Sequence, residues 1–174
     1  MSFPSSVFPP PVWSNQDIVL YHGTLAAYAP AILTKVRVAL GRREKDFGPG
    51  FYMTTTLHQA REWALRRVAQ QLMGDAFPAV IQIIVSREAL ARLQTLAFIR
   101  GDSDADDYWS FVHYCRYGAL DHRRPSPQTY YDVVYGPVSK FWRQSMIFVD
   151  KDQISFHTPA AEEMLNLSRK LLIE

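Results

Sequence analysis

Residues 46–55 read Asp-Phe-Gly-Pro-Gly-Phe-Tyr-Met-Thr-Thr, and this stretch decides how the chain is interpreted. Its glycines and proline are typical of a turn, and its second half, with two aromatic residues, is typical of a strand. Upstream, residues 18–22 (Ile-Val-Leu-Tyr-His) predict another short buried strand, which we expect Gly23 and Thr24 to end. Glycines at such positions let a ligand approach the backbone closely. The two segments together therefore predict a cleft between neighbouring strands.

The pattern around these segments predicts interleaved helices and strands. We expect helices at residues 25 to about 36 (with Pro30 indicating a kink or a late start), 57 to about 73, 104–116 and 159 to about 172, and one helical turn after Ser86. Strands are expected at residues 79–85, 96–99, 131–135, 145–149 and 153–157. Because the late strands cluster, the order favours an α+β fold over a doubly wound sheet. In the helix after residue 56, Ala60, Trp63 and Ala64 share the face expected to be buried.

Length and composition indicate one domain. The chain has 174 residues and a formal charge of +2, so it carries no basic excess of the kind that predicts nucleic-acid binding. We expect a proline-rich N-terminal arm at residues 1–16 and a single domain at residues 17–174. No apolar run is long enough for a membrane span, and no secretion signal of the Sec type is expected, so we expect a cytoplasmic protein.

No metal site is predicted. Asp102, Asp104 and Asp106 begin like a calcium-binding loop, but Asp107 and His113 stand where that loop needs glycine and glutamate. The chain has neither an HExxH nor a CxxC motif, and no glycine-rich phosphate loop of the Walker or Rossmann spacing. The single cysteine excludes an internal disulfide, and a buried thiol is its expected state.

Five segments together resemble the ADP-ribosyltransferase superfamily. They are Tyr-His-Gly at 21–23, the block at 46–55, Gln-Ala-Arg-Glu-Trp-Ala at 59–64, the acidic and aromatic helix at 107–116, and Tyr-Asp-Val-Val-Tyr-Gly-Pro-Val at 131–138. More narrowly, the chain is similar to a small bacterial subgroup, described as a domain of unknown function, with YHG and DFGxGFYxTT motifs. The similarity extends over roughly residues 18–160.

The resemblance implies a split, NAD-binding β-sandwich of two antiparallel-rich sheets with flanking helices, with NAD as a substrate. The diphtheria-toxin-like branch uses a histidine, a tyrosine and an acidic residue on three strands. The implied roles are a ribose hydrogen bond for His22, a backbone contact to the nicotinamide amide for Gly23, and a stack on the nicotinamide for Tyr52. The wider set implied to bind NAD adds Thr24, Phe47, Gly50 and Arg61, with Arg61 or Arg43 at the pyrophosphate.

The third catalytic position departs from this pattern. Gln153 stands where the resemblance places the acidic residue, and an amide can hydrogen-bond a ribose but cannot carry negative charge. Asp132, Asp150 and Asp152 are alternative sources of a carboxylate, and their spacing selects none of them.

The resemblance implies a mono-ADP-ribosyltransferase, acting as a bacterial toxin or effector that is cytoplasmic or delivered into a target cell. It would cleave the nicotinamide–ribose bond and transfer ADP-ribose to a protein or nucleic-acid acceptor. Acceptor choice would depend on the loop at residues 141–153, with contacts from Lys140, Trp142 and Arg143. A small antitoxin or immunity protein is an implied partner; a membrane is not. Two alternatives stay open: an NAD glycohydrolase, and a non-catalytic module that binds NAD or another nucleotide.

Overall fold

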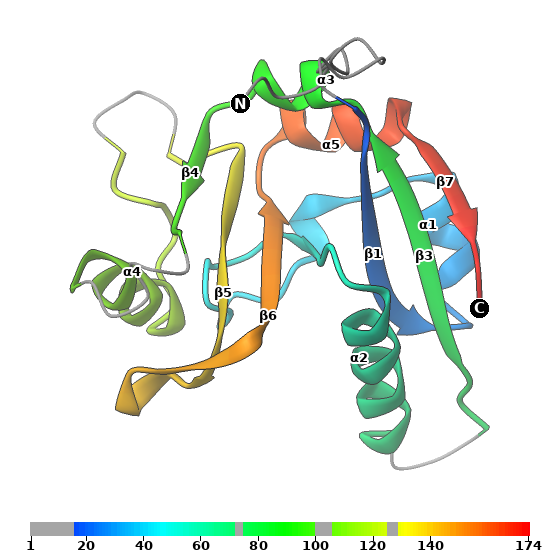
Figure 1. The fold of residues 1–174 in the computed structure, drawn as a ribbon, viewed down its shortest axis with the longest axis horizontal. Coiled ribbons are helices and arrows are strands. Elements are labelled where there is room, and N and C mark those ends of the chain that lie inside the picture. Colours follow the sequence, from blue (N-terminus) through cyan, green and yellow to red (C-terminus); the bar gives the residue numbers. More distant parts are fainter. Residues whose placement is uncertain (1–15, 72–74, 100–105, 125–128) are drawn as a thin grey trace, which may run out of the picture.

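Two β-sheets and their flanking helices form the structure (Figure 1). The computed structural model describes residues 16–71, 75–99, 106–124 and 129–174. The predicted arm, apart from Gln16, and the start of the acidic loop at 100–105 lie outside these ranges. Within the described ranges the α+β prediction is confirmed.

The strands divide into a three-stranded and a four-stranded sheet. Sheet A has the order β1-β3-β7 and sheet B the order β2-β6-β5-β4. Every pairing is antiparallel except the one between β4 and β5. The strands are β1 (Ile18–Leu25), β2 (Phe51–Met53), β3 (Pro78–Val85), β4 (Thr95–Ala97), β5 (Val133–Phe141), β6 (Met146–Phe156) and β7 (Arg169–Leu172).

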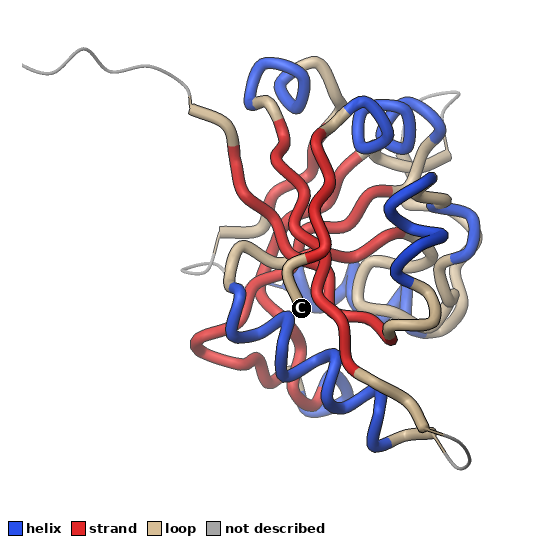
Figure 2. The backbone as a smooth tube through the Cα atoms, turned by 90° about the vertical axis from the view of Figure 1, so that its right-hand side faces the viewer, coloured by secondary structure: helices blue, strands red, loops and turns tan. Residues whose placement is uncertain are grey.

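Helices pack against both sheets and join them. They are α1 (Ala29–Thr34), η1 (Val38–Leu40), α2 (Leu57–Ala69), α3 (Arg87–Ala91), α4 (Asp106–Arg116), η3 (Trp142–Gln144) and α5 (Pro159–Leu167). Helix α2 packs against β1 and β3, whereas α1 contacts β3 and β7. Figure 2 shows the strands in the middle of the molecule, with helices at their periphery. No helix in the described ranges is long and apolar enough to cross a membrane.

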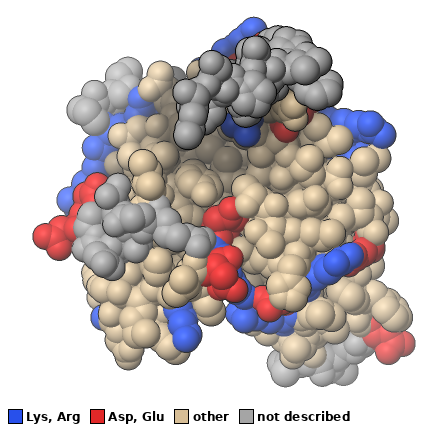
Figure 3. Space-filling view, viewed as in Figure 1, with Lys and Arg blue, Asp and Glu red and all other residues tan. Residues whose placement is uncertain are grey.

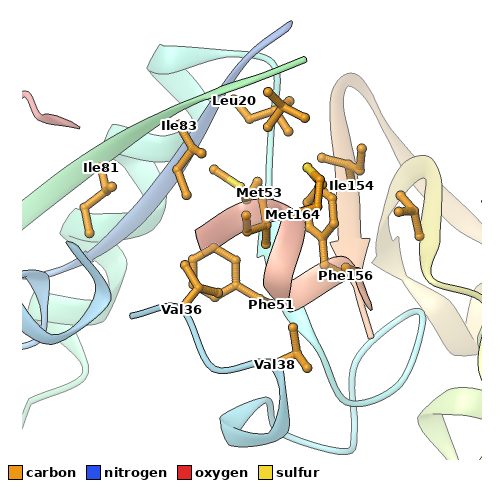
Figure 4. Packing of buried hydrophobic residues seen from close by; sticks show 14 of the residues in the cluster. Leu20, Val36, Val38, Phe51, Met53, Ile81, Ile83, Ile154, Phe156 and Met164 are labelled. Carbon is orange, nitrogen blue, oxygen red and sulfur yellow. The ribbon is translucent and has the colours of Figure 1, made fainter. Parts of the chain in front are cut away.

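The main core lies between the two sheets (Figure 4). Leu20, Ile81 and Ile83 of sheet A meet Ile154 and Phe156 of sheet B, and all five are at most 6% exposed. Side chains alternate between the two faces of a strand, so these residues identify the inward face of each sheet. A second core, on the other face of sheet B, packs Phe47 and Val134 against α4.

Strand β1 continues through Gly23 and Thr24, so the expectation that these residues end it was wrong. Gly23 pairs with Val80, and a Cβ atom there would lie 2.0 Å from the carbonyl oxygen of Ala60 in α2. Glycine is therefore needed for the close packing of α2 on β1, not to break the strand.

The chain also differs from expectation around β6 and β7. The two runs expected at 145–149 and 153–157 are parts of one long strand, β6, and the last helix ends at Leu167 before β7 begins. Helix α1 starts only at Ala29, with Pro30 in its first turn. This is the late start that was one of the two outcomes expected from Pro30. Ser86 caps α3 as predicted, its hydroxyl accepting a hydrogen bond from the Ala89 amide.

Candidate functional site

The two sheets meet at one isolated bridge. The amide of Tyr21 donates to the carbonyl of Thr54 (2.8 Å), and the amide of Thr54 donates to the carbonyl of Tyr21 (2.9 Å). No other bridge between β1 and β2 occurs among the described residues, so on the side of Gly23 the two strands are not paired. The YHG and DFGPGFYMTT segments are therefore neighbours in space, as the predicted cleft between strands requires.

Gly23 presents backbone groups to the gap between β1 and β2. Backbone polar groups alternate between the two edges of a strand, so those of Gly23 point to the same edge as those of Tyr21. Its partner Val80 bonds instead to the backbone of Ile173 and Glu174, beyond β7. In the described part of the chain no strand pairs with Gly23 on the β2 side. One N–H and one C=O thus lie side by side, as a carboxamide ligand needs.

His22 connects the two strands across the gap. Its Nδ1 lies 2.7 Å from the carbonyl oxygen of Tyr52, and its ring stacks on Phe51 with centroids 4.3 Å apart. A carbonyl can only accept, so Nδ1 carries the hydrogen and Nε2 is left as an acceptor. Burial lowers the His22 pKa to about 4, so the ring is neutral at pH 7. A neutral Nε2 can accept a hydrogen bond from a sugar hydroxyl.

The side chains of His22 and Tyr52 do not face each other, which does not fit the expectation that His22 binds the ribose and Tyr52 stacks on the nicotinamide of the same ligand. Phe51 lies on the inward face of sheet B with Phe156, so Tyr52, the next residue, points to the opposite face. The Tyr52 hydroxyl accepts from the amide of Phe47 (3.1 Å) and donates to the carbonyl of Gly48 (2.7 Å). Tyr52 therefore holds the glycine-rich loop.

Two buried histidines hold the same loop from its other side. The Nε2 of His122 donates to the carbonyl of Phe47 (3.0 Å), since its Nδ1 accepts from the Tyr131 amide. The Nδ1 of His157 donates to the carbonyl of Pro49 (2.6 Å), and its Nε2 is 2.7 Å from the Ser155 hydroxyl. Neither His122 nor His157 is a candidate from the sequence, because nothing in their spacing relates them to residues 46–55.

These contacts predict acid-sensitive folding. Burial lowers the pKa values of His22 and His122 to about 4 and that of His157 to about 3. Their pKa values in the unfolded chain are about 6.5, so between these limits the unfolded chain binds more protons. The unfolding free energy should therefore fall as pH drops below about 6.5, by up to ~1.4 kcal/mol per pH unit for each histidine. Urea denaturation at pH 7, 6 and 5 measures this slope.

Variants identify the source of the slope. His122→Gln should remove the contribution of one histidine from the slope, although it also lowers the unfolding free energy at pH 7. His58→Gln is the matched control, because the His58 side chain is 79% exposed. An unfolding free energy that stays level from pH 7 to pH 5 would contradict the prediction.

Asp46 is the centre of a buried polar network. Its carboxylate accepts from the amide (2.9 Å) and the hydroxyl (2.5 Å) of Ser139, from Arg116 Nε (2.8 Å), and from the Gln153 side-chain amide (2.7 Å). Asp46 is 3% exposed and Gln153 is 8% exposed. The network fastens the beginning of the glycine-rich loop to β5, β6 and α4.

This position of Gln153 does not fit the role of a ribose ligand expected for it. Its side-chain nitrogen is already bonded to Asp46 and to the Pro137 carbonyl (2.9 Å), on the outward face of sheet B. We expect Gln153→Glu to lower stability by about 3–5 kcal/mol, because it places a second carboxylate beside Asp46 in a buried site. Thermal unfolding measures this loss. Gln153→Met is the control that adds no charge, and an undiminished stability of Gln153→Glu would contradict the account.

Asp152 is the carboxylate that the structure places at the junction of the sheets. It accepts from the Thr54 hydroxyl (2.5 Å), the Thr55 amide (3.0 Å) and the Thr55 hydroxyl. The Gln59 side chain bonds both backbone groups of Asp152. The two other carboxylates considered from the sequence lie elsewhere. Asp132 accepts from the Gln94 amide and from Thr158, away from the junction. Asp150 is exposed, and its side chain makes no hydrogen bond among the described residues.

Trp63 is 44% exposed, so its predicted place on the buried face of α2 was wrong. The indole lines a small hollow of about 40 Å³ between α2 and the β5–β6 hairpin, together with Gln59, Arg66, Phe148 and Lys151. Lys45 lies 5.2 Å from the centre of its ring. In Figure 3 acidic side chains gather near the middle of this face, with basic ones beside them. The exposed Trp63 indole thus shares this hollow with Gln59, whose side chain bonds the backbone of Asp152.

The other residues predicted to bind NAD are placed as follows. Thr24, Phe47 and Gly50 are buried, and a Cβ atom at Gly50 would lie 2.7 Å from both His157 Nδ1 and the Phe156 carbonyl oxygen, so packing explains that glycine. Arg61 forms an ion pair with the side chain of Glu174 and is not part of the His22 site. Arg43 lines an open hollow of about 440 Å³ together with the rest of residues 41–45. Among the described residues, no group of three acidic, cysteine or histidine side chains is arranged to hold a metal.

Comparison with known families gives one match. Residues 18–141 match the model of a family described as "Protein of unknown function (DUF3990)". The match covers well over half of the chain, so the chain belongs to this family. It includes β1, β2 and the glycine-rich loop and ends before β6, which carries Asp152. A search of curated proteins found no match.

Proposed function

We propose that this member of the DUF3990 family is an NAD-dependent ADP-ribosyltransferase, which cleaves the nicotinamide–ribose bond and transfers ADP-ribose to a macromolecular acceptor. The observation that carries the proposal is the gap between β1 and β2 beside the Tyr21–Thr54 bridge. There, the unpaired backbone edge of Gly23, the free Nε2 of His22 and the carboxylate of Asp152 belong to one junction. The split β-sandwich that binds NAD is part of this proposal.

Nicotinamide fits the edge of Gly23. Its carboxamide has one acceptor and two donor hydrogens, which complement the adjacent N–H and C=O of a strand edge. The imidazole of His22, held by the Tyr52 carbonyl, would accept a hydrogen bond from a ribose hydroxyl at Nε2. Both contacts position the bond that breaks, and precise positioning is a large share of what an enzyme can contribute to such a reaction.

Asp152 takes the role of the acidic residue in this proposal. When the bond between the ribose C1′ and the pyridinium nitrogen breaks, its electron pair leaves with nicotinamide and positive charge develops on the sugar. A fixed carboxylate stabilises that charge, and Thr54 and Thr55 hold the carboxylate of Asp152 in place. The acceptor then bonds to C1′ and loses its proton.

Trp63 replaces Tyr52 as the proposed stacking residue. The Tyr52 hydroxyl is occupied by the loop, whereas the Trp63 indole is exposed next to Gln59, whose side chain bonds Asp152. An aromatic face gives about 0.5–1.5 kcal/mol beyond burial when it stacks on another ring. Tyr52 contributes by shaping the loop.

Transfer and hydrolysis use the same site and differ only in the acceptor, so one experiment separates them. Purified protein is incubated with NAD carrying a label on its adenine, with and without cell extract, and nicotinamide release and labelled macromolecules are measured. Label on protein or nucleic acid supports transfer, and nicotinamide release without labelled macromolecules supports an NAD glycohydrolase. NAD binding without nicotinamide release supports a non-catalytic module. The absence of both NAD binding and nicotinamide release would refute the proposal.

The biological role follows from the same activity. We propose that the chain acts as a bacterial toxin or effector, in which case a small inhibitory partner would cover the gap between β1 and β2. Growth arrest on expression, lost in Asp152→Asn, would support a toxic role. Growth that is equal with the wild type, the variant and an empty vector would count against it.

A further inference from the structure

A group of three basic side chains lies beside the proposed NAD site. Arg42 and Lys45 come from the loop before β2, and Arg67 comes from α2. Lys45 lies over the Trp63 ring at 5.2 Å, and the Arg67 guanidinium lies 6.0 Å from the centre of the Tyr28 ring. Among the described residues none of the three cations forms an ion pair.

The charges of Arg42 and Arg67 act on Lys45. Lys45 is half-buried, and its pKa is lowered by burial first and then by the charges of Arg116, Arg42 and Arg67. Of these, Arg116 is paired with Asp46, and the Asp46 carboxylate only partly offsets the effect on Lys45. Crowding cations in this way costs free energy in the absence of an anion, because like charges repel strongly where water is partly excluded.

The space beside these cations is open. Residues 41–45 line a hollow of about 440 Å³, large enough for a phosphate-bearing group. Glu44 is the carboxylate of that segment, and it is exposed. The Arg67 charge reaches His22 as well as Lys45, since it lowers the pKa of both. Arg67 also stands four residues after Trp63 in α2, on the same side of the helix, and Lys45 lies over the Trp63 ring, so the two cations belong to one part of the surface.

We infer that Arg42, Lys45 and Arg67 form a phosphate-binding site for the pyrophosphate of a dinucleotide, an inference that rests on the proposed function for the identity of the whole ligand. Guanidinium groups bind phosphate oxygens with two parallel hydrogen bonds, and an ammonium adds a third donor. The site replaces Arg61, whose guanidinium is paired with Glu174. Pyrophosphate held here extends toward His22, which holds the ribose.

The test is calorimetric titration of the full chain with ADP, inorganic pyrophosphate and adenosine at low salt. We expect ADP and pyrophosphate to bind and adenosine to bind far more weakly, and we expect binding of ADP to weaken as salt rises. Lys45→Met and Arg67→Gln should each weaken ADP binding about 10-fold, which corresponds to one lost charge-assisted hydrogen bond. Arg92→Gln, an exposed arginine on another part of the surface, is the control with the same loss of charge.

The outcomes separate this site from the proposed function. ADP binding that Lys45→Met and Arg67→Gln weaken supports the site, even if the protein fails to cleave NAD. NAD cleavage whose KM is unchanged in both variants overturns the site while the proposed function stands. Absence of ADP and pyrophosphate binding to the wild type also overturns it. Each variant removes a repelled charge, so we expect unchanged or higher Tm values, which confirm that weaker binding does not reflect unfolding.

Discussion

Replacing Asp152 with asparagine is expected to lower the rate of NAD cleavage by about 100-fold or more while the protein stays folded. The asparagine keeps the size of the side chain and one oxygen that can accept from Thr54 and Thr55, so the turn between β2 and α2 stays attached to β6. It removes the negative charge that would stabilise the developing positive charge on the ribose. Nicotinamide release under saturating NAD measures the loss, and Tm measures the fold.

Asp150→Asn is the matched control for this experiment. Asp150 lies two residues away in β6, but it is exposed and, among the described residues, makes no side-chain bond to Thr54 or Thr55. We expect its rate to stay within about twofold of the wild type, as is usual for a change of surface charge. A rate for Asp152→Asn that equals that of Asp150→Asn would remove Asp152 from the mechanism.

Replacing Asp46 with alanine should destabilise the protein by about 3–5 kcal/mol, because one partner of a buried ion pair is removed. The change leaves the amide and hydroxyl of Ser139 and the side-chain amide of Gln153 without the carboxylate, and it leaves Arg116 unpaired. A typical domain is stable by only about 5–15 kcal/mol, so this loss would be a large fraction of the unfolding free energy. Urea denaturation at pH 7 measures the change.

A second variant tests whether Asp46 is the centre of the network. Arg116→Gln removes a cation that is 26% exposed, together with its bonds to Asp46, Ser139 and the Glu44 carbonyl. The Asp46 carboxylate keeps its bonds from Ser139 and Gln153, so we expect a smaller loss than for Asp46→Ala. Glu163→Ala, on the exposed side of α5, is the control and should change stability by less than about 0.5 kcal/mol. An Asp46→Ala protein as stable as the control would show that the loop is held without the network.

Local patterns predicted most of the elements but not how far they extend. The run at 79–85 and the Ser86 cap were recognisable because alternation and capping depend on residues close in sequence. The merging of two runs into β6 was not, because it depends on a partner strand: β5 pairs with Asp152–Phe156 and, after a register shift, with Met146 and Ile147. Strand β7 was not predicted for a similar reason, since it is defined by its antiparallel pairing with the edge of β3.

For the candidate site, the sequence by itself determined that the segments around His22 and residues 46–55 would be neighbours, as their glycines and strand patterns indicated. Only the tertiary structure decided the role of each residue. Asp46, Tyr52 and Gln153 hold the loop, whereas Asp152 and Trp63 lie at the junction and on the open surface. The reason is physical: the face on which a side chain lies depends on strand register. That register is set by pairing with residues that can be far away in the sequence, as where Phe51 of β2 pairs with Phe156 of β6.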